Sequence, residues 1–156
     1  MMAHDSLDRL MRVMEASFDP YWREAWTRAQ VASSLSLSNT RALMIDCEGG
    51  DGTRTPSRVA GFVLARRAPG EEELLLIAVS PEFRNRGLGR RLLRQFNRSA
   101  KVLGAEKVFL EMRAGNPAET LYRSEGYEPI GRRRDYYTAV DGATFDAVTF
   151  AKSLIE

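Results

Sequence analysis

The spacing of apolar and polar residues predicts which segments of the chain are helical and which are extended. Apolar residues recur every three or four positions over residues 6–17, which predicts a helix, and a second helix is expected over about residues 22–34. Three extended apolar runs follow, over residues 41–48, 59–65 and 72–79, and the last of these runs is apolar on both faces and so should be buried. Their connections are too short for helical crossovers, so the runs predict an antiparallel meander.

The rest of the chain is predicted to alternate helix and strand. One apolar stripe at helical spacing predicts a helix that starts at Gly87 and ends near Gly104. The strand after it should run parallel to the third strand, because a helical crossover joins the two. That strand lies over residues 107–112, and a short helix follows it between Asn116 and Gly126. The last two strands, over residues 128–137 and 144–153, form a hairpin.

This order of elements indicates a single domain, residues 1–156, of the α+β class. Its mixed sheet should contain one β-α-β crossover at the centre. The hydrophobic fraction of 44% and the charged fraction of 28% are ordinary for a globular domain. The longest apolar run is too short to cross a bilayer, so no membrane partner is expected.

The composition also excludes several kinds of chemistry. The chain has one cysteine, Cys47, and one histidine, His4, which excludes an intrachain disulfide and leaves no zinc-ligand spacing. No metal is therefore expected, and a Cys–His nucleophile is disfavoured. The first residues contain neither a basic stretch nor an apolar stretch typical of a signal peptide, so a cytoplasmic location is expected. The net charge of +2 does not require nucleic acid as a partner.

Residues 84–89, RNRGLG, lie between a predicted strand and a predicted helix. The first turn of a helix offers free backbone N–H groups and the positive end of the helix dipole. Gly87 and Gly89 would let an anion approach the backbone, and Arg84 and Arg86 add positive charge. The stretch therefore predicts a phosphate-binding loop, although an ordinary strand-to-helix connection has the same local pattern.

Three residues near the second half of the crossover could take part in chemistry. Glu111 lies in an apolar strand, where an unpaired carboxylate is costly. It is either paired with an arginine, for instance Arg113, or opens into a cleft, where a raised pKa would suit a general base. Tyr122 is either a core residue of the short helix or a proton donor. Asn116 is by default a cap or turn residue.

A basic and aromatic stretch, residues 132–137, begins the C-terminal hairpin. Its tyrosines suit packing in a strand. Its arginine triplet fits a solvated face, an RNA-binding patch or part of a substrate-binding edge. Direct nucleic-acid binding is not favoured, because the basic residues of the helix after Gly87 lack interleaved aromatics for stacking on bases.

Several of these motifs together resemble the GCN5-related N-acetyltransferase (GNAT) superfamily. Residues 81–93, PEFRNRGLGRRLL, are similar to its coenzyme A motif, Arg/Gln-x-x-Gly-x-Gly/Ala at the start of a helix after a bulged strand. Residues 110–113, LEMR, then Asn116 and residues 121–127, LYRSEGY, are similar to the second half of the same fold. With LEMR, residues 131–137, GRRRDYY, resemble the RimI-type ribosomal-protein-alanine N-acetyltransferases.

The resemblance implies the acyl-CoA N-acyltransferase fold, in which the central strands of a mixed sheet splay apart and helices flank the sheet. It also implies acetyl-CoA as the co-substrate. The chain is one residue shorter than the family pattern between Asn116 and Tyr122, so either Gly115 or Asn116 would make the coenzyme contact. The implied coenzyme-binding residues, together with the arginines of the predicted phosphate loop, are Ile77, Ala78, Val79, Arg84, Asn85, Arg86, Gly87, Leu88, Gly89, Arg90 and Asn116.

The resemblance further implies acetyl transfer to a protein N-terminal amine, the N-terminal alanine of small-subunit ribosomal protein 18. Glu111 matches the family's general base and Tyr122 its general acid, while Arg134, Tyr136 and Tyr137 would bind the acceptor. A monomer is expected. Two alternatives stay open, namely a GNAT enzyme for a small amine, a lysine or another N-terminus, and a non-catalytic RNA-binding module.

Overall fold

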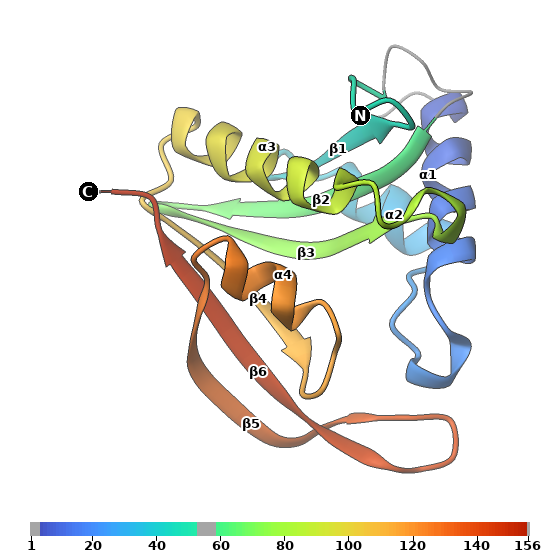
Figure 1. Cartoon of the computed structure of the whole chain (residues 1–156), viewed down its shortest axis with the longest axis vertical. Helices are drawn as coiled ribbons and strands as arrows, with labels where there is room; N and C mark the ends of the chain where they lie inside the picture. Colours follow the sequence, from blue (N-terminus) through green and yellow to red (C-terminus); the bar gives the residue numbers. More distant parts are fainter. Residues whose placement is uncertain (1–3, 53–58, 156) are drawn as a thin grey trace.

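The computed structural model describes residues 4–52 and 59–155, which form one mixed six-stranded sheet flanked by helices (Figure 1). The strand order is β1-β2-β3-β4-β6-β5, and only β3 and β4 run parallel to each other. The predicted meander, crossover and hairpin are thereby confirmed. The strands are β1 (Thr40–Asp46), β2 (Val59–Ala68), β3 (Glu71–Val79), β4 (Lys107–Arg113), β5 (Glu128–Thr138) and β6 (Thr144–Ser153).

Helices cover both faces of the sheet. Phe62 and Leu64 of β2 join the core beneath α1 and α2, whereas Val63 and Ala65 join the core beneath α3 and α4. This alternation follows from the pleat, which sends successive side chains to opposite faces. The helices are α1 (His4–Ser17), α2 (Arg28–Leu35), α3 (Leu88–Val102) and α4 (Glu119–Ser124), with 3₁₀ turns η1 (Pro20–Trp22) and η3 (Pro81–Phe83).

The second helix begins at Arg28, later than the sequence pattern indicates. Thr27 is its N-cap and forms a capping box with Gln30, with hydrogen bonds of 3.1 and 2.8 Å. Residues 20–22 form a 3₁₀ turn instead, because Asp19 caps them separately. Residues 20–27 are therefore a turn and a loop rather than a helix, and this loop reaches the functional site.

Strands β3 and β4 separate after a short paired stretch. Residues 71–74 pair with residues 107–110, and beyond them β3 continues beside β2 while β4 continues beside β6 (Figure 1). A β-bulge at Leu75 shifts the register of β3 against β2, and such bulges bend a strand. The expectation that β3 is buried on both faces is wrong here, because Leu76 and Ile77 are half-buried where β4 has moved away.

A buried ion pair fixes α3 against the sheet. The Glu72 side chain is 0% exposed, and Arg41 donates two hydrogen bonds to its carboxylate, at 2.7 and 2.9 Å. The same guanidinium donates to the Ser99 hydroxyl on α3 (2.8 Å) and lies over the Phe96 ring, 5.7 Å from its centroid. Arg41 and Glu72 come from β1 and β3, which are not neighbouring strands, so the pair bridges β2.

Candidate active site

The start of α3 presents backbone N–H groups to a loop. Gly87 is the N-cap of α3 in a left-handed conformation (φ 76°), and Asn85 is also left-handed (φ 64°). The Arg91 N–H donates to the Gly87 carbonyl (3.1 Å), so the N–H groups before it have no partner inside the helix. Leu88 points into the core, 6% exposed, and can contribute only its backbone. The loop thus has the geometry of the predicted anion site.

The arginines of this loop differ in what holds them. Arg84 donates to backbone carbonyls at the ends of β3 and α1 (2.9 and 3.1 Å), so it anchors the loop. Arg90 donates to Glu125 at the end of α4 (2.7 Å). Arg86 is exposed and lies over the Phe83 ring, 5.5 Å from its centroid. The Arg86 guanidinium and the backbone N–H groups are therefore the best placed to receive an anion.

The edge of β3 beside the gap carries backbone groups that do not bond β2, of which the Val79 carbonyl accepts Arg84 (2.9 Å). The Ser80 N–H donates to the Ala60 carbonyl (2.8 Å), which makes these two residues a hydrogen-bonded pair of the β2–β3 ladder. Such pairs alternate along an antiparallel ladder. Ile77 and Val79 lie in the other pairs, so their N–H and C=O groups point to the side that β4 has left. Ala78 instead bonds toward β2, and its side chain joins the core beneath α1.

Glu111 lies on β4 where the strands have separated. Its side chain is 21% exposed, and its Oε2 lies 3.5 Å from Arg133 Nε and 3.5 Å from the Thr149 hydroxyl on β6. The partner is therefore Arg133 and not Arg113. Burial, followed by the charge of Glu111, raises the pKa of Tyr137 to about 12. The structure thus brings together Glu111 and Tyr137, two of the predicted site residues.

Tyr122 reaches the same region from α4. It is 6% exposed, and its ring centroid lies 6.0 Å from that of Tyr127. Burial raises the pKa of Tyr122, and the charge of Glu24 raises it further, so the phenol is protonated at neutral pH. Within residues 4–52 and 59–155 its hydroxyl makes no side-chain hydrogen bond.

Glu24, Arg113 and Trp22 are site residues that the sequence did not reveal. Arg113, on β4, lies 3.7 Å from Glu24 and stacks on the Trp22 ring, 3.6 Å from its centroid. Burial raises the pKa of Glu24, and the Arg113 charge opposes the shift. The charge of Glu24 is also a lesser cause, after burial, of the raised pKa of Tyr122 and Tyr137. No sequence pattern indicates that Glu24, in a loop near the N-terminus, lies beside Arg113 on β4.

The loop over residues 20–27 forms a wall of the site together with the β5–β6 hairpin. The Tyr21 hydroxyl donates to Asp141 at the hairpin tip (2.8 Å). The Trp22 ring packs edge-on against Phe145, with centroids 4.9 Å apart. The loop therefore closes one side of the region around Glu111.

The predicted acceptor-binding residues differ in where they point. Tyr136 and Tyr137 pack edge to face, with centroids 5.1 Å apart, and Arg133 lies over the Tyr136 ring at 5.1 Å. Arg134 lies at a bulge of β5 and is exposed. The two tyrosines thus border the site. Of the three consecutive arginines, residues 132–134, the one that contacts Glu111 is Arg133 and not the predicted Arg134.

Asn116 and Gly89 lie at the helical border of the gap. The Asn116 side-chain oxygen accepts the Ala118 N–H (3.0 Å), so it caps the turn before α4, which begins at Glu119. A Cβ on Gly89 would contact Leu121 of α4 at 3.6 Å. Gly115 is left-handed (φ 85°), and the question whether Gly115 or Asn116 meets the coenzyme stays open.

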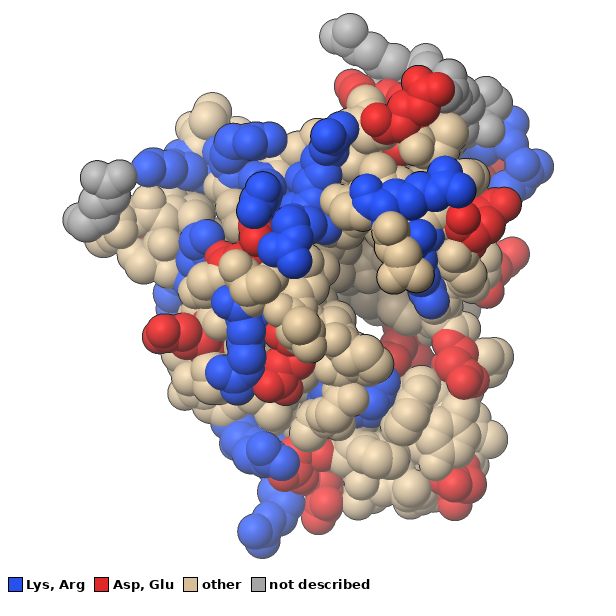
Figure 2. All heavy atoms as spheres, viewed as in Figure 1, with Lys and Arg blue, Asp and Glu red and all other residues tan. Residues whose placement is uncertain are grey.

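Basic side chains gather over α3 on one face of the molecule, and the surface is hollowed between them and the β5–β6 hairpin (Figure 2). No group of three or more metal-ligating side chains occurs in the described parts of the chain. In those same ranges, no helix has the length and apolar character needed to span a membrane.

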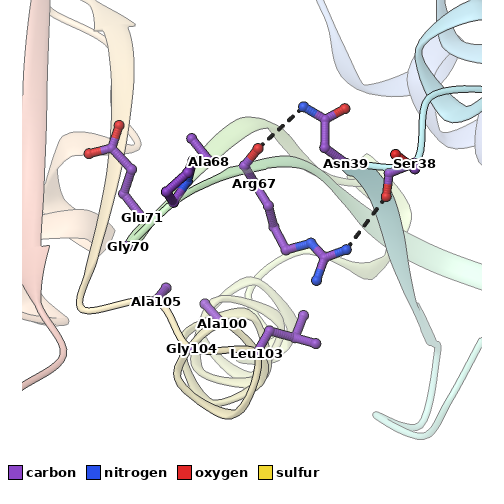
Figure 3. Close-up of a pocket in the computed structure, with 11 residues that line it drawn as sticks. Ser38, Asn39, Arg67, Ala68, Gly70, Glu71, Ala100, Leu103, Gly104 and Ala105 are labelled. Atoms are coloured by element: carbon purple, nitrogen blue, oxygen red, sulfur yellow. Dashed lines mark hydrogen bonds between the residues drawn. The ribbon is translucent and has the colours of Figure 1, made fainter.

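A separate cavity of about 330 Å³ lies beyond the opposite end of β3, beside the C-terminal end of α3 (Figure 3). Two of its polar side chains already bond to backbone, since Asn39 donates to the Arg67 carbonyl (3.2 Å) and Arg67 donates to the Ser38 carbonyl (3.5 Å). None of the predicted site residues lines it. The lining consists of Ser38, Asn39, Arg67, Ala68, Pro69, Gly70, Glu71, Ala100, Leu103, Gly104 and Ala105.

Residues 50–129, which are half of the chain, match the family model described as an acetyltransferase (GNAT) domain. The chain belongs to the GNAT acetyltransferase family. This confirms the family resemblance that the coenzyme motif indicated. The fold is confirmed as well, because the structure superposes on a crystal structure of the Escherichia coli ribosomal-protein-alanine N-acetyltransferase with a TM-score of 0.81 and 24% identity, covering 99% of this chain and 92% of the other.

Two relatives by sequence are named as N-acetyltransferases. The chain is 40% identical over 106 residues to the N-alpha-acetyltransferase RimI of Mycobacterium tuberculosis, covering 65% of this chain and 63% of the relative. It is 36% identical over 95 residues to the [ribosomal protein bS18]-alanine N-acetyltransferase of Escherichia coli, and the match covers 60% of this chain and 64% of the relative. The chain thus spans just under two thirds of these relatives, and a quarter of an uncharacterised Mycobacterium leprae protein that is 42% identical over 93 residues.

Proposed function

We propose that the protein transfers the acetyl group of acetyl-CoA to the N-terminal amine of a protein, in the cytoplasm. The acceptor is the N-terminal alanine of small-subunit ribosomal protein 18, the substrate for which the Escherichia coli relative is named. The observation that carries the proposal is the gap between β3 and β4, which is bordered by the α3 loop, Glu111 and Tyr122.

The residues along the gap fit a coenzyme of this shape. The N–H and C=O of Ile77, which do not bond β2, can bond the amides of a pantetheine arm laid along β3, whereas the Val79 carbonyl already accepts Arg84 (2.9 Å). The N–H groups at the start of α3 and the Arg86 guanidinium suit a pyrophosphate. Acetyl-CoA supplies the reactive thioester, and the Val79 N–H is placed to stabilise negative charge on its oxygen.

Proton transfer is assigned to two side chains. Glu111 takes a proton from the acceptor ammonium, directly or through a water molecule, and the neutral amine then attacks the thioester carbon. The C–S bond breaks as the tetrahedral intermediate collapses, and the nitrogen releases its second proton to solvent. The task of Glu111 is modest, because an α-amino group has a pKa of about 8 and roughly a tenth of it is neutral at pH 7. Tyr122, which burial keeps protonated, donates its proton to the departing thiolate.

Replacing Tyr122 with Phe is expected to lower kcat about tenfold and to leave acetyl-CoA binding unchanged. The loss is smaller than for a typical general acid, because a thiol with a pKa near 8.5 leaves readily as the thiolate. Steady-state kinetics and calorimetry with acetyl-CoA measure the two quantities. Glu106→Gln, at an exposed position before β4, is the control and should leave both quantities unchanged. Equal turnover in Tyr122→Phe and wild type would remove Tyr122 from the mechanism.

The function is tested in two steps. Calorimetry should show binding of acetyl-CoA, and mass spectrometry should then show acetylation of peptides that begin Ala-Arg in preference to free polyamines or lysine side chains. A preference for polyamines or lysine would assign the small-amine or lysine alternative. Ribosomal proteins from a deletion strain should lack one N-terminal acetyl group.

The RNA-binding alternative predicts salt-sensitive RNA binding without acetyl-CoA binding. Arg132 is paired with Asp146 (2.6 Å) and Arg133 with Glu111 (3.5 Å), which supports an acceptor-binding edge over an RNA patch. Proton chemistry at Glu111 and Tyr122 would have no purpose in a module of that kind.

A further inference from the structure

Two arginines of α3 converge on one carboxylate at the end of α4. Arg94 donates to Glu125 from Nε (2.6 Å) and from a terminal nitrogen (3.2 Å), and Arg90 donates to the same carboxylate (2.7 Å). Glu125 is 5% exposed, whereas Arg90 and Arg94 are 43% and 57% exposed. Lys152 of β6 donates to the Glu125 backbone carbonyl (2.6 Å). Both the side chain and the backbone of Glu125 are therefore held from outside α4.

The contact continues along one face of α3. Arg90, Arg94 and Asn97 recur at spacings of four and three residues, which places them on one side of the helix. The Asn97 side chain accepts the Tyr127 hydroxyl (2.6 Å), and Arg90 also donates to Ser124 (2.9 Å). A polar contact zone thus joins α3 to the segment that ends α4.

This zone lies next to Tyr122. The Tyr122 carbonyl accepts the N–H groups of Glu125 (3.2 Å) and Tyr127 (3.0 Å). Helix α4 has only six residues and no side-chain cap at its start, and so short a helix does not persist without tertiary contacts. The orientation of Tyr122 therefore depends on what holds the end of α4.

We propose that Glu125, held by Arg90 and Arg94, is a positioning residue that fixes Tyr122 relative to the coenzyme-binding helix α3. This inference rests on the proposed function. The guanidinium groups, Arg94 first, hold the pKa of Glu125 below its usual range, so the carboxylate is ionised at neutral pH. Charge-assisted hydrogen bonds of this kind fix geometry as well as energy. Small displacements of a catalytic group cost turnover rather than binding.

A double-mutant cycle tests whether Glu125 acts through Tyr122. Glu125→Gln is expected to lower kcat about fivefold in the wild-type background and less than about twofold in Tyr122→Phe, because an effect exerted through the phenol disappears with its hydroxyl. The KM for acetyl-CoA should stay the same in both. A fivefold loss in both backgrounds would mean a general structural effect and would overturn the proposal.

Arg94→Gln is the second variant, because Arg94 is 57% exposed and Arg90 still pairs with Glu125 when Arg94 is replaced. This variant should therefore fold even if Glu125→Gln does not. It should lower kcat about threefold, again only when Tyr122 is present. Arg98→Gln, on an exposed position of the same helix, is the control and should leave kcat unchanged. Unchanged kcat in Arg94→Gln would also overturn the proposal.

Hydrogen exchange separates this proposal from the proposed function. In Glu125→Gln, or in Arg94→Gln, the amides of residues 119–124 should exchange at least about tenfold faster, while those of β2 stay unchanged. Unchanged exchange in α4 would contradict the positioning role. If the wild-type protein transfers no acetyl group but exchange in α4 is still faster in the variants, the proposed reaction is wrong. The role of Glu125 in holding α4 against α3 would then still be supported.

Discussion

Glu111→Gln is expected to lower kcat about tenfold at pH 7 with an unchanged KM for acetyl-CoA, because the amide cannot accept a proton from the acceptor amine and only roughly a tenth of that amine is neutral without a base. Coenzyme binding should survive, since the proposed coenzyme groups lie on β3 and the α3 loop, whereas Glu111 lies on β4 with Arg133 and Thr149. Steady-state kinetics with an Ala-Arg peptide measures both parameters.

The pH dependence of this variant provides a second test. Above the α-amine pKa of about 8 the acceptor is already neutral, so the ratio of wild-type to variant turnover should shrink as the pH rises from 7 to 9. Glu106→Gln removes an exposed carboxylate just before β4 and should leave turnover unchanged at every pH. If Glu111→Gln turns over as fast as wild type at pH 7, Glu111 is not the base.

Local sequence signals predicted the fold well because its elements have clear periods. The apolar stripe of α3 and the short connections of the meander carried the topology, and Gly126 (φ 89°) ended α4 as expected. The start of α2 was misplaced because an apolar count over residues 22–34 overlooked the capping box of Thr27. The sequence did not predict that part of β3 is only half-buried. A run of apolar residues indicates a strand, but it does not indicate where the neighbouring strand separates from it.

The candidate site was predictable only where a motif is local. The α3 loop, Glu111 and Tyr122 follow from short motifs whose resemblance names their roles. Partners are set by tertiary contacts between distant segments, so Glu24 was not found and Arg113 was assigned to the wrong carboxylate. Likewise, no local motif joins Arg94 to Glu125, although the two form an ion pair (2.6 Å). Charges in a sequence reveal how many ion pairs are possible, not which residues form them.

Arg41→Met is expected to destabilise the protein by about 3–5 kcal/mol, because it leaves the fully buried Glu72 carboxylate without its counter-charge. This loss is a large part of the roughly 5–15 kcal/mol by which such domains are stable. It also removes the hydrogen bond to Ser99 on α3, so α3 should loosen first. Urea unfolding followed by circular dichroism measures the free energy.

Two further variants separate the buried charge from a general loss of arginine. Arg66→Met removes the exposed pair with Glu73 (2.7 Å) on the neighbouring strands and should cost less than about 1 kcal/mol. The double variant Arg41→Met/Glu72→Leu should regain most of the stability, because an apolar pair leaves no unpaired buried charge. If Arg41→Met costs no more than Arg66→Met, the pair does not fix α3. If the double variant is as unstable as Arg41→Met, the packing of the guanidinium on Phe96 and Ser99, and not the charge, stabilises this part of the sheet.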